Sequence, residues 1–153
     1  MLKEQYDFIL SSRNTLLNYI KGISEQDFLT NNSSFGRGSI RNLLVHIGQT
    51  YCAWIGERAL GIEQKFLPFE KYQTLKDCQS YFDQVDEYIG LFIEKFKGIE
   101  LQEIEIHRNG EILTVNPLQL FTHVITHEFH HKGQIMSLSR HLGYIPVDAD
   151  IIR

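Results

Sequence analysis

The sequence predicts an all-α fold: a four-helix bundle with a long crossover between the second and third helices and a small β-hairpin before the fourth helix. Four segments space their apolar residues at helical intervals, which is typical of helices that bury one face. Two short segments alternate in polarity on either side of Asn109-Gly110, which indicates a hairpin. Four such helices with one long crossover fit a bundle, and residues 1–153 are expected to form a single domain.

The first helix is predicted over residues 2–21, because their apolar side chains form one stripe at helical spacing. Three charged residues are left to face water: Lys3, Glu4 and Arg13. After Gly22, which is a plausible helix stop, Ser24 begins a short turn that carries Phe28. The Asn-, Ser- and Gly-rich residues 31–38 then indicate a loop.

The second helix is predicted over residues 40–60, with Ser39 as its N-cap and Gly61 directly after its end. At about 100° per residue, His46 lies about 60° from Leu43, at the edge of the apolar face of this helix. We therefore expect the His46 side chain to be at least half buried.

The crossover is predicted over residues 62–73, which contain Pro68 and no clean period. Thr74 then begins the third helix, with Asp77 in the position of a capping box, and Gly98 marks its end. Together these features predict that the second and third helices are joined by a long connection rather than a tight turn.

Two strands are predicted over residues 103–107 and 111–115, and this hairpin is expected to lie against the helices because it is too small to be stable alone. Asn116-Pro117 supplies an N-cap and a first-turn proline for the fourth helix, which is expected to end near Leu142. Three apolar residues are expected to pack the C-terminal tail on the helices: Ile145, Val147 and Ile151.

Histidines are concentrated on the predicted fourth helix, and a helical wheel divides them into two groups. His127 and His131 lie in or at the border of the buried arc, and at a spacing of four residues their rings are neighbours. Three others lie on the wetter flank: His123, His130 and His141. Gln134 lies one turn beyond His131 and can border the same pocket.

This pair predicts a metal site that needs a third ligand from another helix. His46 is the best candidate, because it is the other histidine predicted on a buried helical face, whereas His107 beside the hairpin turn is expected on the surface. Three imidazoles suit zinc or nickel first, with iron or copper as alternatives, and they leave open positions for water or substrate. The alternative interpretation is a set of histidines that are simply hydrogen-bonded in or near the core.

A competing motif overlaps the same residues, because His127-Glu128-Phe129-His130-His131 also satisfies H-E-x-x-H. In a zinc peptidase of that type Glu128 would be the general base. The downstream extension of one large peptidase class is missing, since Gln134 occupies the position that needs glycine. The chain also has little room for a second lobe around a peptide cleft.

The sequence resembles the DinB-like (DinB/YfiT-like) superfamily of small bacterial metal-binding bundles over nearly its whole length. The similarity lies in Leu43-Leu44-x-His46-Ile47, in the crossover, and in the His123, His127, His131-Lys132-Gly133-Gln134 run, where Lys132 replaces the arginine that is common in the family. The resemblance implies a divalent metal held by His46, His127 and His131. His123 corresponds to a frequent preceding histidine, which we assign, with Gln134 and Thr50, to the surroundings of the ligands.

The resemblance also implies a class of activity, because related bundles include transferases and isomerases that use low-molecular-weight thiols. We expect a metal-dependent enzyme, of thiol-transferase or hydrolase type, in which the ion lowers the pKa of a bound water or cofactor thiol that attacks a small molecule. The family name implies a link to stress or DNA damage. The alternative is a non-enzymatic stress protein whose metal only stabilises the fold, and no particular residue is assigned a catalytic role.

The composition of the chain limits the kinds of binding partner and the cellular compartment that we expect. The net charge of −4 argues against nucleic-acid binding, and no apolar run is long enough to cross a membrane. No signal peptide is recognisable, so a cytoplasmic protein with two reduced core cysteines, Cys52 and Cys78, is expected. A homodimer is expected from a second apolar line on the fourth helix, which could equally pack within the chain: Leu118, Ile125, Phe129 and Met136.

Overall fold

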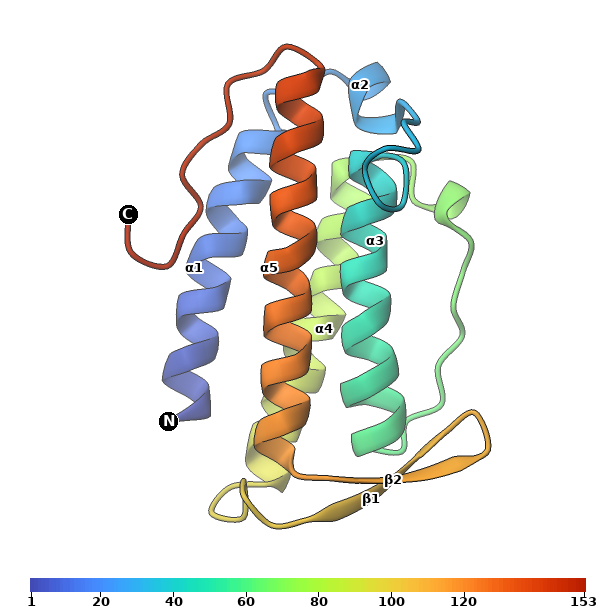
Figure 1. Cartoon of the computed structure of the whole chain (residues 1–153), viewed down its shortest axis with the longest axis vertical. Coiled ribbons are helices and arrows are strands. Elements are labelled where there is room, and N and C mark those ends of the chain that lie inside the picture. Colours follow the sequence, from blue (N-terminus) through green and yellow to red (C-terminus); the bar gives the residue numbers. More distant parts are fainter.

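The computed structural model describes residues 1–153 as a mostly helical chain with one two-stranded hairpin. Four long helices lie side by side (Figure 1): α1 (Leu2–Ile20), α3 (Ile40–Tyr51), α4 (Leu75–Lys95) and α5 (Pro117–His141). A short helix, α2 (Glu25–Leu29), lies between α1 and α3 and buries Phe28. The helical segments predicted from apolar spacing are therefore confirmed.

The connection between α3 and α4 sets the directions of the helices. Residues 60–74 return along the outside of the molecule and contain only a short 3₁₀ turn, η2 (Phe69–Lys71), so α3 and α4 run in the same direction (Figure 1). α1 and α5 run in the opposite direction (Figure 1). α1 packs against α4, α5 packs against α3, and α1 and α5 also contact each other. The predicted long crossover is present, and it leaves α3 and α5 as antiparallel neighbours.

Side-chain caps fix where the long helices begin. Ser39 accepts a hydrogen bond from the amide of Asn42 at the start of α3. α4 and α5 each begin with a reciprocal capping box, as predicted for α4. Thr74 and Asp77 form the box of α4, and Asn116 and Gln119 form that of α5. Each such cap contributes about 1 kcal/mol by satisfying amides that have no partner inside the helix.

The hairpin pairs β1 (Ile104–Arg108) with β2 (Glu111–Val115) in antiparallel register. Asn109 and Gly110 both have positive φ, at 51° and 82°, which is the turn chemistry predicted from this dipeptide. The hairpin lies across one end of the helices (Figure 1), where Ile106 is buried in the core. It is thus held by the helical body, as expected for a hairpin of this size.

One continuous cluster of 31 buried hydrophobic residues joins all four long helices, α2 and the hairpin. The second apolar line of α5 packs within this chain, since Ile125 is buried and Leu118, Phe129 and Met136 are partly buried against the cluster. The homodimer stays a prediction. No helix combines the length and apolar composition that a membrane crossing requires.

Two expectations about side-chain exposure are wrong. Arg13, expected to face water, is only 2% exposed, because buried and half-buried carboxylates from two other helices reach its guanidinium. In the tail, Ile145 is 90% exposed, and Val147 and Ile151 are also exposed. Polar contacts hold the tail instead: the Tyr144 hydroxyl binds Asp27, and Arg153 donates to Ser11.

The end of the second predicted helix also differs from a regular α-helix. α3 continues without a break into a π-helical stretch, η1 (Cys52–Ala59). Such stretches are rare, and they are found frequently at functional sites. Here the wider turn changes which side chains face α5 and the hairpin.

Candidate metal centre

Three histidines from two helices meet between α3 and α5. His46 comes from α3, and His127 and His131 come from successive turns of α5. Their potential ligand atoms all lie within 4.8 Å of one another. The ring of His46 lies 4.9 Å from that of His127 and 4.7 Å from that of His131, centroid to centroid. The structure therefore brings together His46, His127 and His131, which we call the histidine cluster.

The spacing of the ring nitrogens fits a transition-metal ion. The Nε2 atoms of His127 and His131 are 3.1 Å apart. Two nitrogens bound to one ion at about 2.0–2.1 Å would be about 3.0–3.4 Å apart at ordinary coordination angles. Nδ1 of His127, by contrast, is buried without a hydrogen-bond partner, and an ion held at Nε2 of the same ring would leave it unpaired.

Gln134 orients His131. Its Oε1 lies 2.6 Å from Nδ1 of His131. Because an amide oxygen only accepts, this contact places the proton on Nδ1 and leaves the lone pair on Nε2, facing His127. Gly36 lies directly over this amide, since a Cβ at Gly36 would be 2.5 Å from Oε1 of Gln134, and its φ of +61° also favours glycine.

The histidine cluster is electrically neutral near pH 7. Burial, assisted by the positive charge of Arg37, lowers the pKa of His46 to about 3. Burial, with His131 and His123 nearby, lowers the pKa of His127 to about 4. Burial also lowers the pKa of His131, against the opposing hydrogen bond from Gln134. The imidazoles therefore keep the free lone pairs that a metal requires.

The other predicted residues surround this cluster at different distances. Thr50 donates to the backbone oxygen of His46 at 3.0 Å, one turn along the same helix. His123 packs on Trp54 at 4.7 Å between ring centroids and lies 6.2 Å from His127. His130 is exposed, with its ring 4.9 Å from that of His131, centroid to centroid. The wheel prediction that His123 and His130 lie on the flank is thus confirmed.

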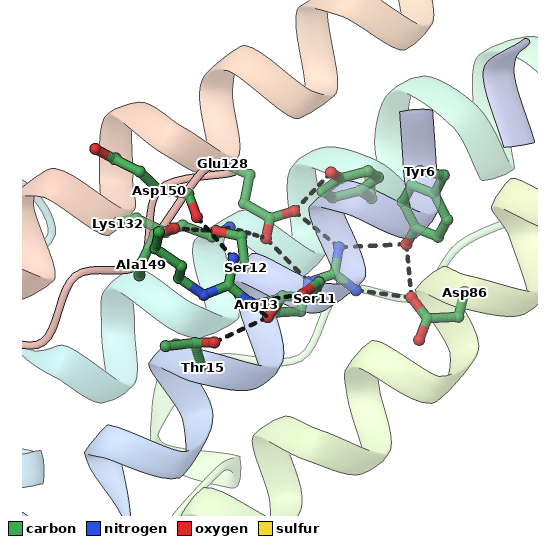
Figure 2. Close-up of polar contacts among 12 residues, drawn as sticks. Tyr6, Ser11, Ser12, Arg13, Thr15, Asp86, Glu128, Lys132, Ala149 and Asp150 are labelled. Carbon is green, nitrogen blue, oxygen red and sulfur yellow. Dashed lines mark hydrogen bonds and ion pairs between the residues drawn. The ribbon is translucent and has the colours of Figure 1, made fainter. Parts of the chain in front are cut away.

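Glu128 points toward α1, where its carboxylate meets Arg13 (Figure 2). Its carboxylate accepts hydrogen bonds from the Arg13 guanidinium at 3.0 and 2.7 Å and from the Tyr51 hydroxyl at 2.6 Å. Nζ of Lys132 completes its surroundings at 3.1 Å. A carboxylate that is fully buried and paired in this way is not available as the general base that the H-E-x-x-H interpretation requires.

Arg13, Asp86, Glu128 and Lys132 form what we call the ion-pair cluster (Figure 2). Burial by itself would raise the pKa of Glu128, but Arg13, Lys132 and Tyr51 together outweigh burial and lower this pKa to about 2. Lys132 also donates to Ser12 at 2.8 Å. Lys132 therefore has two defined partners, Glu128 and Ser12.

The two cysteines lie outside this site. Cys52 and Cys78 are free and almost completely buried. Burial raises the pKa of Cys78 to about 12 and also raises that of Cys52. Neither side chain is available as a thiolate nucleophile at neutral pH.

A pocket of about 290 Å³ opens beside His46 and is lined in part by Thr50, Trp54, Arg58 and Phe66. Sequence reasoning assigned neither Arg58 nor Trp54 to a site. The available signal was the spacing of four residues between them, which puts an aromatic ring and a cation on the same side of a helix. Arg37, close to His46, lies in a loop whose conformation no periodicity predicts.

Comparison with protein families identifies the family of the chain. A model of the DinB family matches residues 1–153, the full length of the chain. The curated proteins searched give no match to the sequence. The family match covers the histidine cluster, the crossover and the hairpin alike.

Proposed function

Because the chain belongs to the DinB family, we propose that it is a four-helix bundle that binds a divalent transition metal and acts as a metal-dependent enzyme on small molecules. His46, His127 and His131 would hold the ion, with zinc or nickel as the first candidates and iron or copper as alternatives. Gln134 would keep His131 in the ligating tautomer.

The observation that carries this proposal is the number and kind of the ligand atoms. Three neutral imidazoles converge, and no Cys, Asp or Glu side chain joins the group. Structural zinc sites are closed by four protein ligands, whereas catalytic sites keep a position open for water or substrate. The pocket that His46 lines would bring a small molecule next to one of the three proposed ligands.

A bound divalent ion supplies Lewis acidity, by which a water or a thiol becomes a nucleophile at neutral pH. The chain itself provides no such thiol, because Cys52 and Cys78 are buried in the core with raised pKa values. A transferase reaction would therefore use a low-molecular-weight thiol from solution, and a hydrolase reaction would use water. Both versions are consistent with the small volume of the pocket.

Metal analysis tests the proposal. Protein purified without added metal should contain a stoichiometric transition metal by elemental analysis, and His127→Ala should lose it while His107→Ala, on the exposed hairpin, keeps it. Absence of metal from the unmodified protein under metal-replete expression would refute the proposal. For the thiol version, glutathione or bacillithiol should change the absorption spectrum of the cobalt-substituted protein, and an unchanged spectrum would remove it.

A non-enzymatic metal-bearing stress protein is the second candidate. It is favoured by one observation: the ligands come from α3 and α5, so an ion would cross-link two helices that are far apart in sequence. This candidate predicts a large fall in melting temperature on chelation and no exchangeable water on the metal by relaxation measurements. An exchangeable water with a small change in melting temperature would favour the enzyme.

A further inference from the structure

The pocket beside His46 contains a cation, Arg58, that forms no salt bridge. The Arg58 guanidinium lies over the Trp54 ring, with Cζ 4.5 Å from the ring centroid. Nη1 of Arg58 is buried and has no hydrogen-bond partner. A buried donor of a charged group without a partner is costly, and a bidentate oxyanion is the group that a guanidinium binds best.

Two further arginines face the same region. Arg108 of β1 also lies over the Trp54 ring, with Cζ 5.7 Å from the ring centroid. Nη2 of Arg37 lies 3.4 Å from Nε2 of His46. None of the three arginines forms an ion pair with a carboxylate. Their charge lowers the pKa of neighbouring histidines, since burial and then Arg108 and Arg58 lower that of His123.

This concentration of positive charge is local, because the whole chain carries a net charge of −4. The arginines come from three separate segments: the loop before α3, η1 and β1. A cleft with one sign of charge attracts ligands of the opposite sign. Beside this charge the pocket has an apolar wall, formed by Ala53, Trp54 and Phe66.

The π-helical stretch explains how Arg58 reaches the pocket. Arg58 follows His46 by twelve residues, and on a regular α-helix it would point roughly 120° away from it. Each residue of a π-helix turns through a smaller angle, because the hydrogen bonds close over five residues rather than four. Arg58 and Trp54 are thereby turned back to the side of His46, and all three line one pocket.

We propose that this pocket is a subsite for the oxyanion group, carboxylate or phosphate, of a small molecule with an apolar body, and that Arg58 is its principal recognition residue. The inference deepens the proposed function and rests on it for the identification of this molecule as a substrate. Arg37 and Arg108, which do not line the pocket, add long-range electrostatic attraction for the oxyanion. Trp54 provides a flat surface for the apolar part of the molecule.

The only tryptophan of the chain, Trp54, lies in the pocket and makes its fluorescence a site-specific probe. Benzoate should give a saturable change, phenyl phosphate should show whether phosphate replaces carboxylate, and benzamide, the neutral isostere of benzoate, should bind much more weakly. The titrations are made with the protein as purified and after chelator treatment. Loss of a hydrogen-bonded charge partner predicts that Arg58→Gln weakens benzoate binding by about tenfold or more.

Arg140→Gln is the matched control, because Arg140 is an exposed arginine of α5 outside this pocket. This variant should bind benzoate with the affinity of the unmodified chain. Arg58→Lys keeps the positive charge but lacks the planar guanidinium. Its benzoate affinity should lie between that of the unmodified chain and that of Arg58→Gln. Circular dichroism identifies any variant that fails to fold, and Arg58→Lys then provides the comparison.

Two results would overturn the inference. One is unchanged benzoate affinity in both Arg58 variants. The other is binding that requires metal and ignores Arg58, which would place the anion on the ion itself. Failure of the proposed function is distinguishable, because benzoate should bind to metal-free protein through Arg58 even if no metal is ever found in the histidine cluster.

Discussion

The histidine cluster and the ion-pair cluster lie on adjoining sides of α5, where His127 precedes Glu128 and His131 precedes Lys132. In the ion-pair cluster every Glu128 oxygen is matched by a donor, and charges of opposite sign face one another. In the histidine cluster two ring nitrogens face one another at 3.1 Å, and a third buried nitrogen has no partner. The first arrangement is complete without a ligand, whereas the second leaves a buried ring nitrogen without a partner and has three converging imidazoles with the geometry to hold a metal ion.

Polar groups that are fully paired within the protein therefore stand directly beside polar groups that are not, because the two clusters alternate along neighbouring residues of α5. The ion-pair cluster connects α1, α4 and α5, and Tyr51 adds α3, so its hydrogen bonds link all four long helices. The same helix, α5, carries His127 and His131, which meet His46 of α3. The comparison can be tested by removing groups from each cluster in turn.

Glu128→Ala should have the largest effect. It leaves Arg13 and Lys132 as buried cations without their shared partner, and breaking a buried ion pair in this way costs about 3–5 kcal/mol. Urea denaturation measures the free energy of unfolding, with Glu94→Ala, at an exposed position, as the control that should leave it unchanged. The double variant Arg13→Met, Glu128→Leu should recover part of the loss, and purely additive losses would contradict the assigned pairing.

Acidification should destabilise the metal-free protein in two steps. The pKa values of His46 and His127, about 3 and 4 in the folded chain, lie below the 6.5 of unfolded histidine, so stability falls as pH drops below about 6.5. The pKa of Glu128 is about 2 when folded and 4.5 when unfolded, so a second loss follows between those values. Urea titrations at successive pH values measure both steps, and stability that rises below pH 6 would contradict the account.

His131→Ala should leave the ion-pair cluster intact and weaken metal binding. Loss of an outer-sphere partner typically reduces metal affinity about 10–100-fold, and loss of a direct ligand should exceed that range. Competition with a chromophoric chelator measures the affinity, and the metal-free variant should unfold at nearly the same urea concentration as the metal-free unmodified chain. A variant that keeps full metal affinity would show that His131 is not a ligand.

Gly36→Ala should have the smallest effect of the four, because it acts on the metal only through Gln134 and His131. The added methyl group would displace the Gln134 amide, and an affinity loss of about tenfold is expected. Gly98→Ala is a matched control, since Gly98 has a similarly positive φ of +81° but no atom near the added Cβ. Equal effects of the two substitutions on metal affinity would exclude the proposed contact.

Local patterns in the sequence predict the helices, their caps, the hairpin turn and the inward direction of His127 and His131. What they miss depends on partners that are distant in the sequence. Arg13 lies four residues after Ile9 and three before Leu16, in line with the apolar stripe, but its buried partner Glu128 is 115 residues away. As a charged residue, Arg13 was expected to face solvent, whereas its position in the apolar stripe indicated that it faces the core.

The π-helical stretch is a second feature that local patterns do not reveal. Nothing in the apolar spacing of residues 52–59 distinguishes it from a continued α-helix, and its consequence is the position of Arg58 beside His46. His46 itself could be selected from the sequence as a partner for the α5 pair. The contact of Arg37 with His46, by contrast, depends on the conformation of the loop before α3.

Anomalous diffraction from crystals of protein purified without added metal tests the central claim most directly. If the histidine cluster holds the ion, one anomalous peak lies between α3 and α5, at about 2.0–2.1 Å from a ring nitrogen of each of His46, His127 and His131. A metal bound elsewhere on the chain would contradict it. So would a metal-replete preparation in which no peak lies among these three rings.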